Sequence, residues 1–406
     1  MKAIIFINTN KSGSSREALR AAEQLGYYTI LFTNKEKQIQ QREEFTEVHK
    51  MVLVDLSDLP KIRKEIYKLQ AQGIEIETIV SFIDPLVHTA SLLCDEFCHN
   101  NTSSEAIEKM EDKDKTRLLL KGQPYSPIFF SVKPDEKITS HVMYEQLDFP
   151  VIIKSAKSTG SKDVLLAEGK GQLQNYFRNF REKNPEDVIL IEEYIDGPQY
   201  LVEVLVRNSM AHIIAIVEQE ITKGRRFIIT GYGVLAEAPK KMKTEIEKVL
   251  QSIVTEFGID NGAMHLELRL GKNGWKLIEI NPRISGGAMN KMIQAAFGFS
   301  LVKETLKLFV GKTPNIEPRY KKDVFTKYII VSKKGRLLKV TGKGRAGNSP
   351  GVVEVYVKPK KGTLLIPPLS MGHRYAYVIA TGDNINEAKS NANNAAKEIK
   401  FLIEEE

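Results

Sequence analysis

Residues 264–283, MHLELRLGKNGWKLIEINPR, are the stretch of sequence from which the fold can be argued most directly. Apolar and polar residues alternate in two runs, and the Asn273-Gly274 pair between them is a strong signal for a β-hairpin. Side chains in a strand alternate between its two faces, so Glu279 and Asn281 share one face. Folding the hairpin about Asn273 then places Glu267 opposite Glu279.

This hairpin gathers two carboxylates and an amide oxygen on one patch. Mg²⁺ prefers oxygen ligands, and the phosphates of a substrate can complete its coordination shell. Arg283, two residues after Asn281, is expected to project the same way, where its guanidinium can hold a phosphate or carboxylate oxygen. The alternative is an exposed strand face with cross-strand charge pairs. It is less favoured, because the apolar residues between the acids indicate that the opposite face is buried.

Two further segments carry weaker signals for a nucleotide site. In FPVIIK, residues 149–154, an apolar strand ends in Lys154. The loop that follows contains the small residues Ser158, Thr159, Gly160 and Ser161. Such a loop lets backbone N–H groups approach phosphate oxygens while the lysine neutralises their charge. The second segment, VILIEEYI at residues 188–195, is a strand whose backbone can pair with the edge of an adenine ring.

The surrounding pattern predicts an α/β protein with three parts. Alternating strands and helices over residues 1–103 predict an open parallel α/β domain, which lacks a Gly-x-Gly-x-x-Gly phosphate loop. Residues 104–310 begin with a helix over 104–120 and contain the hairpin. Residues 311–406 are strand-rich and are expected to form a C-terminal α/β domain that ends in a helix over 385–403.

These segments, in this order and spacing, resemble the ATP-grasp superfamily. The resemblance extends to MEDKDKTR at residues 110–117 and is most specific at IEINPRISGG, residues 278–287. It covers most of residues 104–310. It implies an α+β ATP-grasp domain in two parts, with a mobile lid at about 141–206. It also implies that ATP binds with Mg²⁺, as two ions for which Mn²⁺ can substitute.

The resemblance also assigns roles to residues of the three motifs. Lys113 and Lys154 would contact the ATP phosphates, and Ser158–Ser161 would close over them. The adenine would be read, mostly by backbone groups, at Glu192, Glu193, Tyr194 and Ile195. Metal ligands would be Glu267, Glu279 and Asn281. Arg283, together with Lys154, would stabilise the transferring phosphoryl group.

One position departs from the family pattern. The family often has an acid two residues after the glycine of the adenine strand, where it holds the ribose hydroxyls. This sequence has Gln199 there. An amide can still bond a hydroxyl, and Glu203 is a candidate substitute.

Within the superfamily, the C-terminal sequence resembles the L-amino acid ligases. The resemblance rests on PPLSMGHRYAYVIATG, residues 367–382, and on the loop after Arg283. These ligases are bacterial dipeptide synthetases, some of them serving peptide antibiotic pathways. The resemblance implies two L-amino acids as substrates, joined through an acyl phosphate with release of ADP and phosphate.

Several residues are candidates for the substrate site. Ser285, Gly286 and Gly287 are expected to border the acyl group, with backbone N–H groups available to a carboxylate. Glu218 and Glu220 can hold an ammonium group, and a plain polar strand is an equal alternative. His265 is a candidate proton acceptor or a packed strand histidine.

Composition narrows the class of protein further. No apolar run reaches membrane-spanning length and no signal peptide is recognisable, so a cytoplasmic protein is expected. The only cysteines, Cys94 and Cys98, are too few for a disulfide framework and are interpreted as buried thiols. The net charge is +8, yet the basic stretch 333–345 lacks interleaved aromatic residues. We therefore expect small-molecule partners and no nucleic acid, and a homodimer is one candidate assembly.

Two rival functions remain open from the sequence. One is another ATP-grasp carboxylase or ligase, acting on bicarbonate, a nucleotide precursor or a thiol. The other is a non-catalytic nucleotide-binding regulator on the same scaffold. The joint presence of Glu267, Glu279, Asn281 and Arg283 argues against the regulator.

Overall fold

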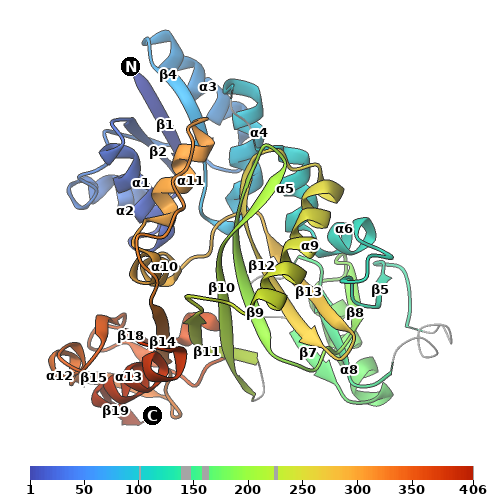
Figure 1. Ribbon diagram of the computed structural model, residues 1–406. Coiled ribbons are helices and arrows are strands. Elements are labelled where there is room, and N and C mark those ends of the chain that lie inside the picture. Colours follow the sequence, from blue (N-terminus) through green and yellow to red (C-terminus); the bar gives the residue numbers. More distant parts are fainter. Residues whose placement is uncertain (100–101, 139–147, 158–163, 224–226, 406) are drawn as a thin grey trace.

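The computed structural model describes residues 1–99, 102–138, 148–157, 164–223 and 227–405. Its strands form four sheets with strand orders β3-β2-β1-β4, β5-β8-β6-β7, β13-β12-β9-β10-β11-β14-β18-β16 and β17-β15-β19. Figure 1 shows the N-terminal part above the C-terminal part, with the long central strands beside both. No helix in the described part of the chain is long and apolar enough to cross a membrane.

The N-terminal part is a parallel α/β layer, as the sequence predicted. Its strands are β1 (Lys2–Ile7), β2 (Tyr28–Thr33), β3 (Lys50–Leu53) and β4 (Glu75–Val80), and all their pairings are parallel. The helices of this part are α1 (Ser14–Gln24), α2 (Glu36–Gln40), α3 (Leu59–Ala71) and α4 (Val87–Phe97). Apart from its first residue, β1 is wholly buried, as expected for a strand with helices on both faces.

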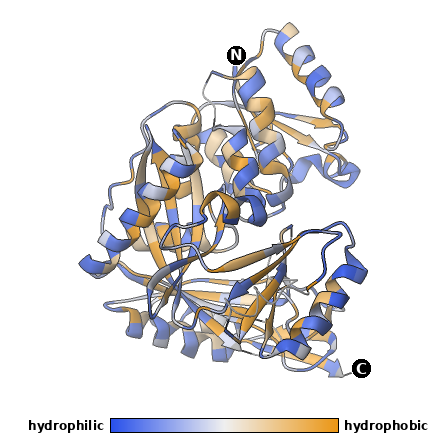
Figure 2. Cartoon of the chain, turned by 90° about the vertical axis from the view of Figure 1, so that its right-hand side faces the viewer, coloured by the Kyte–Doolittle hydropathy of each residue, from blue (hydrophilic) through white to orange (hydrophobic). Residues whose placement is uncertain are grey.

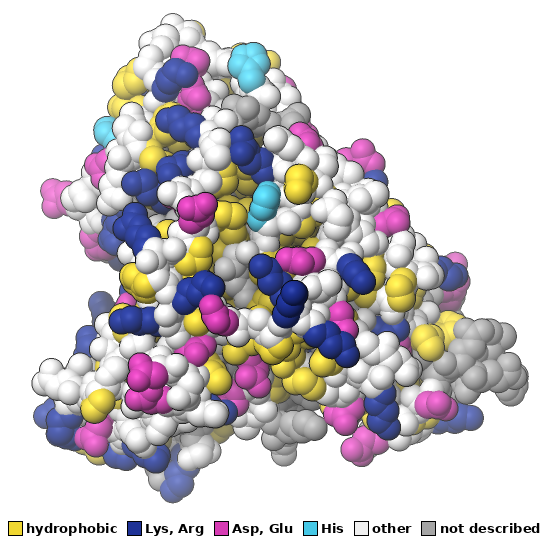
Figure 3. Space-filling model, in the orientation of Figure 1, with side chains coloured by type: hydrophobic (Ala, Val, Ile, Leu, Met, Phe, Trp, Pro, Cys, Tyr) yellow, Lys and Arg dark blue, Asp and Glu magenta, His cyan; other side chains and the backbone are white. Residues whose placement is uncertain are grey.

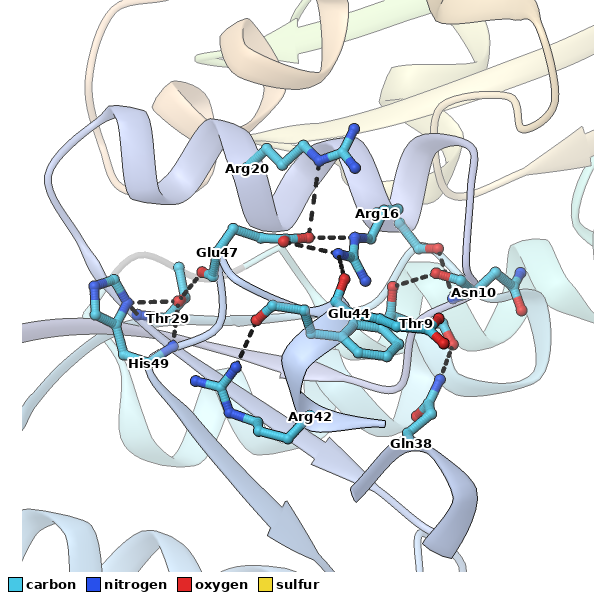
Figure 4. Close-up of polar contacts among 12 residues, drawn as sticks. Thr9, Asn10, Arg16, Arg20, Thr29, Gln38, Arg42, Glu44, Glu47 and His49 are labelled. Carbon is cyan, nitrogen blue, oxygen red and sulfur yellow. Dashed lines mark hydrogen bonds and ion pairs between the residues drawn. The ribbon is translucent and has the colours of Figure 1, made fainter. Parts of the chain in front are cut away.

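A buried ion pair fixes the start of α1 in this layer (Figure 4). The Arg16 guanidinium pairs with the carboxylate of Glu47 and lies 4.1 Å from the centroid of the Phe45 ring. Both charged side chains are almost fully buried, so each neutralises the other where water cannot. The pair anchors the loop before β3 against α1, whose first residue reaches the candidate site described below.

The expected helix over 104–120 is two helices, α5 (Ser104–Glu111) and α6 (Lys113–Leu119). The break falls at Asp112, whose carboxylate accepts hydrogen bonds from the backbone N–H groups of Asp114 and Lys115. Asp112 therefore acts as an N-cap, and a new helix begins there with its own direction.

A small antiparallel sheet forms a separate layer between residues 129 and 193. It contains β5 (Phe129–Val132), β6 (Val151–Ser155), β7 (Val164–Ala167) and β8 (Ile189–Glu193), with helix α8 (Lys170–Lys183). This layer begins earlier and ends earlier than the expected lid at 141–206, because β9 pairs with strands of the large sheet. Mobility of the layer stays a prediction.

The eight-stranded sheet is the centre of the molecule. Its strands are β9 (Gln199–Arg207), β10 (Met210–Lys223), β11 (Phe227–Val234), β12 (Gly262–Gly271), β13 (Gly274–Asn281), β14 (Asp323–Ile329), β16 (Val352–Val357) and β18 (Ala376–Gly382). Helix α9 (Lys240–Phe257) packs on one face. Helices α10 (Met289–Phe297) and α11 (Leu301–Phe309) pack on the other, and α1 of the parallel layer packs against α11. The strands are largely hydrophobic and the outer helix faces hydrophilic (Figure 2).

The C-terminal part continues this sheet through β14, β18 and β16, so the sheet crosses the expected boundary at residue 310. Its own small sheet contains β15 (Gly335–Thr341), β17 (Leu364–Leu365) and β19 (Lys400–Glu405). The remaining helices are α12 (Lys343–Gly347) and α13 (Ile385–Glu398). The expected helix over 385–403 was therefore too long, because its last residues pair with β15 as strand β19.

Candidate functional site

The hairpin formed by β12 and β13 presents the predicted patch. Glu267 pairs directly with Glu279, and His265 with Asn281, in antiparallel register. Gly274 occupies the turn with a φ of 95°, a conformation that suits glycine and explains the Asn-Gly signal. The expected facing of the two acids is confirmed by this register.

Glu267 is held by amides from the neighbouring strands. Gln199 of β9 and Gln219 of β10 donate hydrogen bonds to its two carboxylate oxygens at 2.9 and 3.3 Å. Burial and the charge of Glu279 raise the pKa of Glu267 to about 7. Within the described part of the chain, no ion pair joins this carboxylate. A bound cation would therefore stabilise the ionised form of Glu267.

Glu279 lies beside a lysine. The Lys113 Nζ, at the start of α6, is 3.2 Å from a Glu279 carboxylate oxygen. Burial opposes the charge of Glu279, but the positive charges of Lys113 and Lys154 outweigh it and lower the pKa of this carboxyl. The hairpin and the start of α6 thus bring together acids and a lysine that lie far apart in the sequence.

A second buried charge cluster lies on the small sheet. Glu192 of β8 contacts the Lys154 Nζ at 2.8 Å and the Arg117 Nε at 2.7 Å. Burial lowers the pKa of Lys154 to about 8, although Glu192 raises it. Burial would raise the pKa of Glu192, but Arg117 and Lys154 lower it to about 2. Arg117 also donates to the Ile278 carbonyl oxygen at 2.8 Å, and so ties this cluster to β13.

An open cavity of about 800 Å³ lies between the small sheet and the large sheet, and we call it the inter-sheet cavity. Charged side chains and an apolar wall contribute to its lining. The lining residues are Lys113, Pro127, Ile152, Lys154, Val164, Glu192, Glu193, Tyr194, Ile195, Gln199, Ile221, Ile229, Glu267, Arg269, Ile278, Glu279 and Met371. An apolar wall beside a few charged side chains suits a nucleotide, whose base is planar and whose phosphates are charged. Acidic and basic side chains also gather where the three parts of the molecule meet (Figure 3).

The adenine and ribose candidates are partly brought together. Glu192–Ile195 and Gln199 line the inter-sheet cavity. Glu203 does not, which corrects the expectation that it substitutes at the ribose. It is fully buried, and its carboxylate accepts from the Ser285 backbone N–H at 3.1 Å. Burial raises the pKa of Glu203 to about 7.

The loop after the hairpin is tied to the N-terminal part. The Ser14 hydroxyl, at the start of α1, donates to the Ser285 carbonyl oxygen at 2.7 Å. It also accepts from the Asn290 amide at 2.8 Å. Gly287 has a φ of 66° and approaches the Tyr328 hydroxyl of β14. Ser285, Gly286 and Gly287 therefore lie where all three parts of the chain meet.

Arg283 does not continue the alternation of β13. The strand ends at Asn281, whose carbonyl oxygen accepts from the Arg283 N–H. The Arg283 guanidinium forms an ion pair with Asp84 of the N-terminal part. His265 Nδ1 lies 2.8 Å from the Arg283 carbonyl oxygen, and burial lowers the pKa of His265 to about 4. A neutral histidine bonded to backbone fits the packed interpretation, and a role in proton transfer stays a prediction.

One expected pair of acids is not brought to the patch. Glu218 and Glu220 flank Gln219 on β10, so the alternation of the strand directs them away from the face that carries Gln219. Glu218 is exposed, and Glu220 pairs with Lys327 and Lys389 of the C-terminal part. Ser158, Thr159, Gly160 and Ser161 lie outside the described residues.

The protein side chains at this site supply only part of the coordination shell that magnesium needs. In the described ranges, no group of three or more acidic, histidine or cysteine side chains could hold a metal alone. The facing pair Glu267 and Glu279, with the Asn281 amide, supplies oxygen atoms and an uncompensated charge. That donor set suits a hard cation whose shell is completed by phosphate oxygens.

Sequence reasoning missed several residues of the site. Arg117 and Gln219 act through contacts with Glu192 and Glu267, and Asp84 pairs with Arg283 across the domain junction. Arg117 carried one available signal, since it stands in the quoted MEDKDKTR segment and a fully buried arginine needs an acidic partner. Gln219 and Asp84 carried none, because their partners are distant in sequence.

Three family models match this chain. They are an ATP-grasp N-terminal domain over residues 19–97, an ATP-grasp domain over 147–291, and an L-amino acid ligase C-terminal domain 2 over 327–404. The first lies in the parallel α/β layer. The second contains Lys154, Glu192 and the whole hairpin. The third contains Met371, which lines the inter-sheet cavity.

Two proteins of similar sequence match most of this chain. An uncharacterized protein from Sinorhizobium fredii is 24% identical over 358 residues, which cover 86% of this chain and 73% of that protein. An L-arginine-specific L-amino acid ligase from Bacillus subtilis is 21% identical over 350 residues, or 84% of this chain and 83% of that protein.

The crystal structure of an L-amino acid ligase from Bacillus licheniformis has the same fold. It matches with a TM-score of 0.83 at 19% identity, covering 100% of this chain and 99% of that chain. The motifs, the fold and these matches show that the chain belongs to the ATP-grasp superfamily, as an ATP-dependent carboxylate–amine ligase whose C-terminal part is an L-amino acid ligase domain.

Proposed function

We propose that this ligase joins two L-amino acids, activating the carboxylate of one as an acyl phosphate before the amine of the other attacks it. One observation carries the proposal. Lys113 and Glu279 line both the inter-sheet cavity and a second cavity, which opens toward the N-terminal part. A carboxylate in the second cavity can therefore lie beside the terminal phosphate of a nucleotide in the first.

The second cavity offers groups that suit an amino acid. It is lined by Asp84, Glu111, Asn281 and Pro282, among others. Glu111 has a buried carboxylate oxygen with no hydrogen-bond partner among the described residues, and burial raises its pKa to about 7. An ammonium group would satisfy this oxygen and stabilise the ionised carboxylate. The arrangement supports a substrate that carries both a carboxylate and an ammonium group.

The chain's own residues account for charge and position in this proposal. ATP would occupy the inter-sheet cavity, with Lys113 and Lys154 beside its phosphates and Glu192–Ile195 beside its adenine. Magnesium would be held by Glu267, Glu279 and Asn281. Two ions would bind there, and Mn²⁺ could replace them. The metal would supply positive charge to the phosphate oxygens. Arg283 would leave Asp84 to stabilise the transferring phosphoryl group, since positioning and charge neutralisation dominate such reactions.

A pairwise screen of the L-amino acids for ADP release tests the proposal. ADP is expected with particular pairs, in step with a dipeptide of matching mass. The Glu279→Gln variant, measured in parallel, controls for contaminating ATPases. ADP release with bicarbonate or a nucleotide precursor, but with no amino acid pair, would identify a different ATP-grasp ligase. ATP binding without ADP release under any of these conditions would favour the non-catalytic regulator.

Hydroxylamine distinguishes the intermediate. An acyl phosphate reacts with hydroxylamine to give a hydroxamate, so one amino acid with ATP and hydroxylamine is expected to yield its hydroxamate and ADP. Arg283→Ala is expected to reduce this rate far more than it weakens ATP binding. Equal losses in both quantities would leave Arg283 with a binding role only. The pathway, the homodimer and the cytoplasmic location stay predictions.

A further inference from the structure

A turn of the C-terminal part reaches the inter-sheet cavity. Met371 begins the short 3₁₀ helix η3 (Met371–His373) and lines the cavity together with Ile221 of β10 and Ile229 of β11. This residue lies 80 positions beyond the end of the ATP-grasp domain match at residue 291 (371 minus 291). The residues of the ATP-grasp domain match therefore form only part of the lining of this cavity.

Arg374 holds the turn against β11. Its Nε donates to the Met371 carbonyl oxygen at 3.2 Å, and its Nη1 donates to the Ile229 carbonyl oxygen at 3.3 Å. The guanidinium carbon lies 3.9 Å from the centroid of the Tyr328 ring and 5.8 Å from that of Tyr232. One planar cation thus fixes the backbone of two residues that line the cavity.

The turn is also secured from its other side. The Lys358 Nζ, after β16, donates to the Gly372 carbonyl oxygen at 3.0 Å. A single-turn helix with its carbonyl groups held by two cations is a defined surface rather than a free loop. The thioether of Met371 is polarisable and adapts its shape, which suits contact with a planar base or a sugar.

We propose that Met371 forms a wall of the nucleotide site and contacts the bound adenine nucleotide, and that Arg374 is the residue that positions it. The C-terminal part would then contribute directly to ATP affinity, in addition to extending the large sheet. This inference rests on the assignment of the inter-sheet cavity to ATP under the proposed function.

Met371→Ala and Arg374→Met test the inference on the full chain. Each is expected to raise the KM for ATP and the Kd for Mg-ADP about fivefold. The kcat at saturating ATP and the KM for the amino acids should change less, because both residues lie away from the second cavity. Arg345→Met is the matched control, since Arg345 is an exposed arginine of the same part that pairs with Glu398.

Calorimetric titration with Mg-ADP alone, without amino acids, separates the possible failures. Unchanged Mg-ADP binding by Met371→Ala would overturn the inference, and this variant keeps the test valid if Arg374→Met does not fold. Lys154→Met, whose folding is checked by its Tm, tests whether the nucleotide binds in the inter-sheet cavity. If Lys154→Met binds Mg-ADP normally, the assignment of the cavity to ATP fails. If only Lys154→Met loses binding, the assignment stands and the C-terminal wall is rejected.

Discussion

Glu192 and Glu267 line the same cavity from opposite sheets, but their surroundings differ in charge. Glu192 contacts Arg117 and Lys154, and its pKa is lowered to about 2 by their charges against the effect of burial. Glu267 accepts from two amides, and burial together with Glu279 raises its pKa to about 7. The first acid is already neutralised by the protein. The second gains most from a cation that arrives with the substrate.

This difference separates a positioning role from a binding role. Glu192 keeps Lys154 fixed at the cavity. Its negative charge is offset by the two cations that it contacts. Glu267 stores an unfavourable charge that magnesium would relieve. A buried acid next to a phosphate site is therefore informative only once its own cations are identified.

The largest expected effect comes from Glu267→Gln. We expect ADP formation to fall by about 10³-fold or more, since the variant removes a metal ligand at the transferring phosphate. The Tm should not fall, because a carboxylate repelled by Glu279 is replaced by a neutral side chain of the same shape. Steady-state ADP assays and thermal unfolding measure the two outcomes, with the exposed Glu247→Gln on α9 as control. A variant with normal turnover would remove Glu267 from the metal site.

Glu192→Gln should show the opposite profile, with loss of stability foremost. It leaves Arg117 and Lys154 without their shared acid, and breaking a buried ion pair costs about 3–5 kcal/mol of unfolding free energy. Urea unfolding of the variant measures this loss, with the exposed Glu182→Gln on α8 as control. Stability equal to that of the control would mean that the cluster is solvated and that the contrast with Glu267 does not hold.

Glu203→Gln tests a third kind of buried acid, which forms no ion pair within the described ranges and has no proposed ligand. The folded-state pKa of about 7 lies above the ordinary 4.5, so the native state retains a proton that the unfolded chain releases. Wild-type stability should therefore fall as pH rises from about 4.5 to 7, by up to about 3 kcal/mol.

The Glu203→Gln variant lacks this titration but keeps an oxygen that can accept from the Ser285 N–H. It should match the wild type near pH 4.5 and exceed it at pH 8. Unfolding free energies measured by urea across this range decide the matter. Parallel pH profiles for the two proteins would show that Glu203 is ionised and compensated in a way that the contacts do not reveal.

The smallest expected effect is on the pH dependence of ATP binding. Burial lowers the pKa of Lys154 to about 8, so the free enzyme loses this positive charge above that pH. Phosphate binding then requires proton uptake, and the KM for ATP should rise by up to about tenfold per pH unit above pH 8. Initial rates at fixed amino acid concentrations from pH 7 to 9.5 measure the trend. A flat profile would place Lys154 away from the phosphates.

The sequence alone determined the features that depend on neighbouring residues. Strand alternation and the Asn-Gly turn placed Glu267 opposite Glu279, and the strand–helix pattern predicted the parallel N-terminal layer. The helix over 104–120 was wrong at one point, because the capping bonds of Asp112 outweighed a continuous helical pattern. These are local effects, since turn chemistry, capping and periodicity act over a few residues.

Only the tertiary structure decided which charges meet. Glu203 was a candidate for the ribose contact, but β9 carries it to the buried backbone of Ser285. Arg283 was expected beside Asn281, and it pairs with Asp84 from another part of the chain. The wall at Met371 likewise comes from a distant segment. Pairing among distant charges depends on how whole layers pack, because the energy of a buried charge is set by partners that no local pattern encodes.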